Sequence, residues 1–180
     1  MAPTLLICPG IGNSGPKHWQ SLWEQAHDGF VRVGQRDWFR PVCTDWVDTL
    51  DETVRRHGPD AVFVAHSLAC LAIAHWACQR GTQIRAAFLV AVPDAAGPSF
   101  PSEAQGFAST PMCRLPFPSL VVASTDDPYA SLKYSMDCAT AWGSRFVNIG
   151  RAGHINADSG YGDWPEGYAM LQEFLKLTCG

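Results

Sequence analysis

Charged residues are scarce in this sequence. Asp, Glu, Lys and Arg make up 17% of its 180 residues, and the formal net charge is −4. Nucleic acids and anionic membranes bind to basic surfaces, so neither is expected as a partner. No apolar run approaches the ~20 residues that a transmembrane helix needs, which predicts no membrane insertion. The N-terminus lacks the basic stretch of a signal peptide, which favours a cytoplasmic protein.

Paired cysteine motifs are also missing. The seven cysteines are an odd number, lie far apart and form no C-x-x-C pair, which predicts free thiols in a reducing compartment. His75 and Cys78 have a spacing that metal ligands use on a helix, but no second pair completes a site. Packing is therefore the expected role of both residues, and neither a metal nor a cofactor is expected.

The chain does contain a regular alternation of short apolar runs and helical patterns, with no internal repeat. Strands that are apolar on both faces and alternate with helices indicate a parallel sheet with helices on each face. The predicted fold is therefore an α/β class, three-layer α/β/α sandwich with a mostly parallel sheet of about six strands. Strands are predicted at 4–8, 39–44, 61–65, 84–92, 119–124 and 145–150, and helices at 16–29, 45–58, 67–81, 129–143 and 164–177.

One long segment, residues 93–118, has no such pattern and is rich in Pro, Gly and Ser. Irregular loops of this length are uncommon in compact proteins and usually form a lid or a binding loop. The segment contains no second apolar core. A single domain that covers residues 1–180 is therefore expected.

Three of the predicted strands are followed by residues with catalytic chemistry. In an open parallel sheet, ligands bind at the carboxyl ends of the strands. Ser67, the pair Asp126 and Asp127, and His154 follow three strands in that order along the chain. The order Ser, Asp, His is that of enzymes whose nucleophile stands on a sharp strand-to-helix turn.

Ser67 lies where an apolar strand changes into an Ala-rich helix. A serine on such a turn is strained, and the residues two positions to either side must be small. Glycine is common at both places, whereas this sequence has Ala65 and Ala69, which are small enough but make the turn tighter. The alternative is that Ser67 is a plain helix N-cap. The acid and the histidine in the correct order favour the nucleophile.

Two aspartates compete for the acid, and one histidine fits the base. Asp127 is favoured over Asp126 because it precedes Pro128, and a residue before proline is held in extended geometry. His154 follows the last predicted strand in a loop that Gly153 loosens, which is where a general base is expected.

Four stretches of the sequence resemble one protein family. PGIGNSGPKHWQSLWE, AHSLA, STDDPYAS and GRAGHINADSGYGDWPEG are similar to the small serine hydrolases that include retinoblastoma-binding protein 9 and the bacterial YdeN-like proteins. The resemblance covers essentially the whole chain. It implies a minimal α/β-hydrolase fold without a large cap domain, with Ser67, Asp127 and His154 as the catalytic triad.

Such a site also needs backbone donors and a pocket. The N–H of Leu68 and a second N–H from the loop after the first strand, Ile11 first and Gly12 next, are predicted to bind an oxyanion. The glycines of that loop could instead make only a tight turn. The residues predicted to contact the substrate are His18, Trp19 and Trp164, with Tyr129 as a further candidate, although tryptophan is more often simply packed in a core.

The expected function is that of a carboxylesterase-like serine hydrolase. It would act on a small acyl ester or similar substrate through an acyl-enzyme intermediate, without a cofactor. The alternative is a non-catalytic protein-interaction module on the same fold. A nucleotide-binding enzyme is disfavoured because GIGNSG is only a weak phosphate-loop match and no acidic residue ends a second strand in the required place.

Overall fold

The computed structural model describes residues 3–80 and 83–178. Within them, one six-stranded sheet has the strand order β2-β1-β3-β4-β5-β6, and every neighbouring pair is parallel. The strands are β1 (Leu5–Cys8), β2 (Phe30–Arg32), β3 (Val62–His66), β4 (Ala86–Val90), β5 (Ser119–Ala123) and β6 (Arg145–Asn148).

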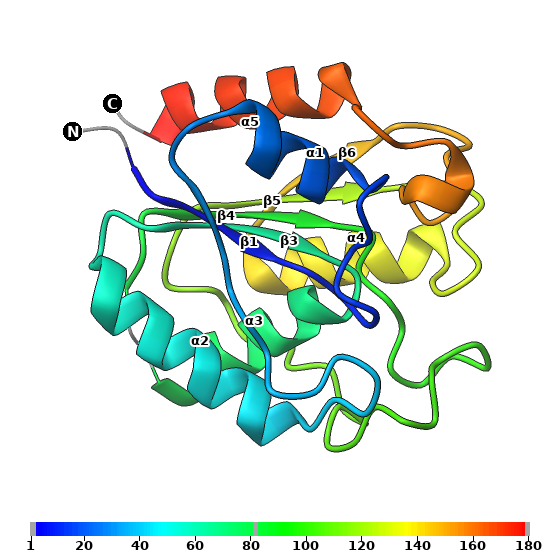
Figure 1. Ribbon diagram of the computed structural model, residues 1–180. Helices are drawn as coiled ribbons and strands as arrows, with labels where there is room; N and C mark the ends of the chain where they lie inside the picture. The colour runs from blue at the N-terminus through cyan, green and yellow to red at the C-terminus, as the bar shows by residue number, and fades with distance from the viewer. Residues whose placement is uncertain (1–2, 81–82, 179–180) are drawn as a thin grey trace.

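Helices cover both faces of the sheet (Figure 1). Helices α1 and α5 pack on one face, and α2, α3 and α4 pack on the other. This is the three-layer α/β-hydrolase architecture that the sequence predicts. The α-helices are α1 (Trp19–Ala26), α2 (Cys43–His57), α3 (Leu68–Arg80), α4 (Leu132–Trp142) and α5 (Pro165–Thr178), and a 3-10 helix, η1, covers Ala157–Ser159.

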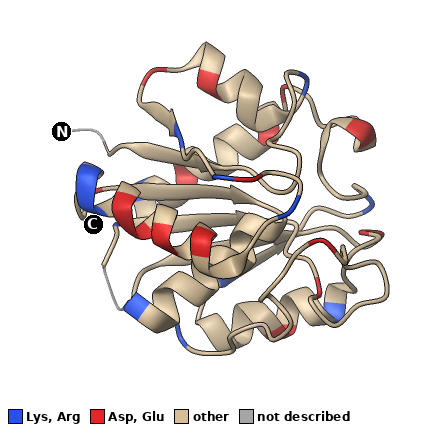
Figure 2. Cartoon of the chain, turned by 60° about the horizontal axis from the view of Figure 1, so that its bottom comes forward, with Lys and Arg blue, Asp and Glu red and all other residues tan. Residues whose placement is uncertain are grey.

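The four central strands are buried on both faces. All residues of β1, β3, β4 and β5 are buried, whereas the edge strands β2 and β6 are partly exposed. Figure 2 shows Lys, Arg, Asp and Glu on the helices and loops around these uncharged central strands. Burial on both faces explains why the central strands are continuous apolar runs without alternation.

The sequence prediction fails at the first edge of the sheet. The strand expected at 39–44 does not form, because Cys43 already begins α2 and Val42 makes only an isolated bridge with Gln105. Instead β2 lies at residues 30–32, a run too short and too exposed to be recognised from its pattern. Helix α1 begins at Trp19 rather than at residue 16, and the predicted end of α3 at Gly81 lies outside the described residues.

The 93–118 segment is irregular, as predicted, and packs against the helical layer below the sheet. The Phe107 side chain is fully buried there, and the Trp142 indole donates to the Pro111 carbonyl at 2.7 Å. The segment therefore adds to one side of the sandwich and does not build a large cap over it. None of the helices in residues 3–80 and 83–178 combines the length and the apolarity that a bilayer crossing needs.

A disulfide joins this segment to α3. Cys78 and Cys113 are linked, with their Cα atoms 6.6 Å apart, so the expectation that every cysteine is a free thiol is wrong. The two residues are 35 positions apart, and only the path of the long loop brings them together. Cys8, Cys43, Cys70 and Cys138 are free and buried, and Cys179 lies outside the described residues.

Candidate active site

Ser67 occupies a strained turn between β3 and α3. Its φ of 56° lies in the left-handed region, which is uncommon for residues other than glycine. The Ser67 N–H donates to the Val90 carbonyl of β4 at 2.9 Å, which fixes the turn to the neighbouring strand. The side chain is thereby held at the carboxyl edge of the sheet.

The end of β1 passes very close to this turn. A Cβ atom added to Gly10 would lie 2.9 Å from the Ser67 Cβ, which is closer than real Cβ contacts allow, and 3.2 Å from the His66 carbonyl oxygen, which is a tight contact. Ala65 and Ala69 are also almost fully buried, with 0% and 3% of their surfaces exposed. The turn around Ser67 is therefore closely packed, and a side chain at Gly10 would require a shift of the backbone or of Ser67.

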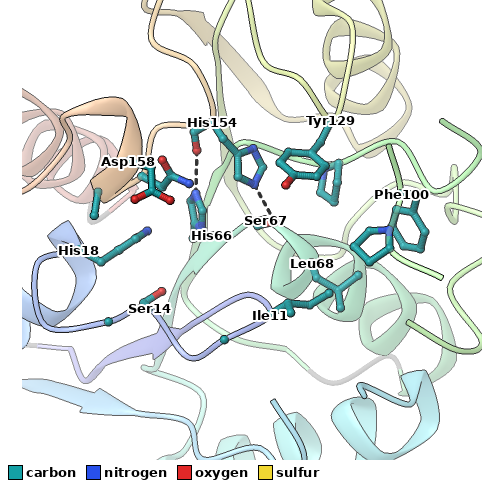
Figure 3. A pocket seen from close by; sticks show the side chains of 16 residues that line it. Ile11, Ser14, His18, His66, Ser67, Leu68, Phe100, Tyr129, His154 and Asp158 are labelled. Carbon is teal, nitrogen blue, oxygen red and sulfur yellow. Dashed lines mark hydrogen bonds between the residues drawn. The ribbon is translucent and has the colours of Figure 1, made fainter. Parts of the chain in front are cut away.

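His154 connects Ser67 to Asp127. The His154 Nε2 lies 2.9 Å from the Ser67 Oγ, and Figure 3 marks this contact. The His154 Nδ1 lies 2.9 Å from both carboxylate oxygens of Asp127, which also accepts the Tyr129 N–H at 2.9 Å. Only 8% of the His154 side chain and 4% of the Asp127 side chain are exposed. The three predicted residues thus form one hydrogen-bonded chain in a site largely shielded from water.

Asp126 points away from this chain and binds a different part of the site. Its Oδ1 accepts the N–H groups of Ala152 at 2.8 Å and Gly153 at 2.9 Å, as well as the Ser124 hydroxyl at 2.9 Å. The Gly153 N–H, followed by the Ser124 hydroxyl, lowers the pKa of Asp126. Asp126 therefore holds the loop that carries His154, a role that the sequence does not reveal.

The predicted backbone donors differ in what they already bind. The Gly12 N–H donates to the Trp38 carbonyl at 3.0 Å, whereas the Ile11 N–H makes no hydrogen bond within the described residues. Leu68 is the first residue of α3, so its N–H precedes the intrahelical ladder. Leu68 and Ile11 therefore keep N–H groups that a ligand could use, and Gly12 does not.

These residues surround a cavity of about 410 Å³. Figure 3 shows Ser67 and His154 between a more apolar part, with Ile11, Leu68, Phe100 and Tyr129, and a more polar part, with Ser14, His18 and Asp158. The described residues contain no group of three or more His, Cys, Asp or Glu side chains arranged to hold a metal ion. The remaining lining residues are Gly12, Gly15, His66, Pro93, Pro101, Asn156 and Ala157.

Of the predicted substrate contacts, the structure brings only His18 and Tyr129 to the cavity. Trp19 and Trp164 are not among its lining residues and are 0% and 6% exposed. The Trp19 indole donates to the Ile155 carbonyl at 3.0 Å, and the two indole rings pack 5.3 Å apart. Both tryptophans therefore belong to the core between the sheet and α5, which corrects the prediction.

Comparison with known proteins identifies the family. Residues 5–173 match the family model described as serine hydrolase. The chain belongs to the serine hydrolase family. No curated protein matches the chain.

Solved structures of similar proteins agree with this family. A protein described as a YdeN-like hydrolase from Pectobacterium atrosepticum is 31% identical, with a TM-score of 0.85 over 97% of this chain and 91% of that one. The ydeN gene product of Bacillus subtilis is 22% identical, with a TM-score of 0.79 over 96% and 98%. An esterase from Rhodococcus sp. ECU1013, at 16% identity and a TM-score of 0.69 over 96% and 90%, shares the fold. The resemblance to small serine hydrolases is confirmed.

This serine hydrolase carries two further buried histidines beside His154. The His66 Nε2 lies 2.9 Å from the His154 backbone carbonyl, so His66 is the donor and holds the His154 loop. Burial, reinforced by His18 and His154, lowers the pKa of His66 well below its usual value. Burial, reinforced by His154 and Arg32, lowers the pKa of His18 to about 3. Both rings are therefore neutral at physiological pH.

The close contact at Gly10 predicts a specific loss of activity. Gly10→Ala should displace Ser67, because the new Cβ would lie within 2.9 Å of the Ser67 Cβ. We expect kcat/KM for ester hydrolysis to fall by about 10²-fold or more, since small misplacements of a reacting group are costly. Gly34→Ala, where an added Cβ meets nothing within 4 Å, is the control. Equal activity of the two variants would contradict this account of the turn.

The burial of neutral His18 predicts a pH dependence of stability. Below pH 6.5 a histidine in the unfolded chain takes up a proton that folded His18 does not bind until about pH 3. The unfolded state then binds more protons, so the free energy of unfolding falls as the pH falls. His18→Asn should reduce this fall by about 1.4 kcal/mol per pH unit between about pH 6 and pH 4. Urea unfolding at several pH values measures it, and parallel wild-type and variant curves would disprove it.

Proposed function

We propose that this serine hydrolase is carboxylesterase-like, with Ser67 as the nucleophile, His154 as the general base and Asp127 as the acid that orients it. The observation that supports this proposal is the hydrogen-bonded chain from the Ser67 Oγ through both ring nitrogens of His154 to the Asp127 carboxylate. A serine hydroxyl is a weak nucleophile until an adjacent base removes its proton. In this row of hydrogen-bonded residues, which lies at the wall of a cavity, His154 supplies that base.

The first half of the reaction forms an acyl-enzyme. The Ser67 Oγ attacks the acyl carbon while the His154 Nε2 takes the hydroxyl proton, and Asp127 stabilises the imidazolium that results. The negative charge on the carbonyl oxygen is met by the N–H groups of Leu68 and Ile11, and the positive end of the α3 dipole lies on the same side. His154 then gives its proton to the departing alcohol, and the ester bond to that alcohol breaks.

The second half releases the acid. A water molecule gives one proton to His154 and attacks the acyl carbon, and the second tetrahedral intermediate expels the Ser67 Oγ, which recovers its proton from His154. Each proton is transferred at the same Nε2 atom, so one well-placed imidazole serves both halves. None of the steps requires a metal or a cofactor.

The cavity favours a small acyl substrate. Its volume of about 410 Å³ is at the lower end of the range for small-molecule sites. Phe100, Leu68 and Tyr129 offer an apolar wall next to Ser67 that suits a short aliphatic or aromatic group. The Rhodococcus structural neighbour is described as an esterase, which agrees with an ester as the substrate. We further propose that residues 1–180 act as one domain around this site.

Removal of the Ser67 hydroxyl tests the nucleophile. Ser67→Ala should lower kcat for p-nitrophenyl butyrate by about 10⁴-fold or more, because the covalent route is lost. The variant should keep the wild-type circular dichroism spectrum, since only the hydroxyl that contacts His154 is removed. A fluorophosphonate probe should label wild-type Ser67 and not the variant. A folded Ser67→Ala protein with wild-type rates would exclude the proposed mechanism.

The two neighbouring aspartates provide an internal comparison. Asp127→Asn should lower kcat by about 10⁴-fold, because an amide stabilises the wrong tautomer of His154. Asp126→Asn should cost far less, because its amide oxygen can still accept the N–H groups of Ala152 and Gly153. Steady-state kinetics on the same ester, with thermal unfolding to verify the fold, measures both. The opposite ranking would show that Asp126 is the acid.

A further inference from the structure

One residue that lines the cavity, His18, has a polar atom without a partner among the described residues. His18 is 5% exposed, and its Nδ1 accepts the Gln20 N–H at 3.2 Å as the N-cap of α1. A neutral imidazole that accepts at Nδ1 carries its proton on Nε2. The Nε2 of His18 is buried, yet it makes no hydrogen bond to any described residue. A buried donor without an acceptor costs about 1–3 kcal/mol, so this position calls for a ligand atom.

Neighbouring side chains do not supply that acceptor. The His66 ring lies 4.7 Å from the His18 ring between centroids, but its Nε2 donates to the His154 carbonyl and its acceptor nitrogen makes no hydrogen bond to the His18 Nε2. The Ser14 hydroxyl donates to the Gln20 side-chain oxygen at 2.6 Å. Figure 3 shows the His18 ring reaching toward the part of the cavity where His66 and Asp158 lie. The His18 ring therefore points toward the space that a substrate would occupy.

The charges in this part of the cavity restrict what can bind. Asp158 is exposed at the rim, and no Lys or Arg is among the lining residues. A carboxylate or phosphate group near His18 would be repelled by Asp158, and Arg32, the cation that acts on His18, does not line the cavity and is already paired with Glu24 at 2.6 Å. The Ser14 oxygen and the Asp158 carboxylate are both acceptors. A neutral group that can accept from His18 and donate to Asp158 fits best, and a hydroxyl does both.

We propose that His18 is a specificity-determining residue whose Nε2–H donates to a hydroxyl group of the substrate, and that this hydroxyl donates to Asp158. The inference rests on the proposed hydrolase function. It identifies the substrate class as a hydroxylated ester, with the hydroxyl on either the acyl or the alcohol part. Because the pKa of His18 is lowered to about 3, the ring offers this donor in the neutral state over the whole working range of pH.

Matched pairs of esters test the proposal. One pair is p-nitrophenyl 3-hydroxybutyrate and p-nitrophenyl butyrate, and the other is 2-hydroxyethyl acetate and ethyl acetate. The readout is the ratio of kcat/KM for the hydroxylated ester to kcat/KM for its partner. Wild-type protein should prefer the hydroxylated ester about tenfold or more in one pair, which also tells which part of the substrate carries the hydroxyl. A ratio near one in both pairs would overturn the proposal.

Two substitutions at His18 distinguish the capping role of its Nδ1 from the proposed donor role of its Nε2. His18→Asn keeps an oxygen that can cap Gln20 but removes the donor at the Nε2 position, so the ratio should fall to about one. His18→Gln places an amide N–H near the Nε2 position and weakens the cap, so the ratio should stay well above one. A ratio lost in His18→Gln and kept in His18→Asn would overturn the assignment. Asp158→Asn should lower the ratio without abolishing it, and this variant remains informative if His18→Asn does not fold.

Controls distinguish failure of this inference from failure of the proposed function. The Nε2 of His75 is also buried and makes no hydrogen bond to a described residue, but His75 does not line the cavity, so His75→Asn should leave the ratio unchanged. Wild-type hydrolysis of ethyl acetate or p-nitrophenyl butyrate without a hydroxyl preference would overturn only the role of His18. Absence of hydrolysis and of fluorophosphonate labelling would overturn both. A preference for p-nitrophenyl hydrogen succinate over p-nitrophenyl butyrate would show that the group bound is anionic.

Discussion

The left-handed backbone of Ser67 is the constraint on which the rest of the site depends. A residue with a side chain adopts this conformation only where its surroundings hold it there. Here β4 accepts the Ser67 N–H through Val90, Gly10 leaves room at the end of β1, and α3 begins at the next residue. Three adjacent parallel strands thus fix one serine. The buried strands on either side of the turn therefore hold a strained residue in place.

The sequence predicts the regular central strands well, but it predicts the short edge strand and the disulfide poorly. The central strands are apolar on both faces, so their runs are visible, and the carboxyl ends of β3, β5 and β6 place Ser67, Asp127 and His154 on one edge of the sheet. The edge strand at Phe30–Arg32 has only three partly exposed residues, so its pattern carries almost no signal. Cys78 and Cys113 pair through the path of a long irregular loop, and no spacing rule describes that path.

Within the site, adjacent residues differ in the direction of their side chains, which the sequence does not show. His18 and Trp19 are adjacent, but α1 begins between them, so one lines the cavity and the other enters the core. Asp126 and Asp127 are adjacent too, and one binds backbone N–H groups while the other binds His154. Their positions in the sequence put all four residues near the site. The local backbone at each position, a turn or a helix cap, directs the side chain toward the cavity or away from it.

Three histidines, His18, His66 and His154, lie close together but make different contacts. Among the described residues, neither His18 nor His66 has a carboxylate partner, and burial keeps both rings neutral. Only His154 contacts a buried carboxylate, which can stabilise a positive charge on its ring during a reaction. A second imidazolium beside it would raise the energy of that charge, because like charges repel strongly in a site that excludes water. In the mechanism proposed above, neutral neighbours let His154 take up and release a proton, while His66 holds its loop and His18 lines the cavity.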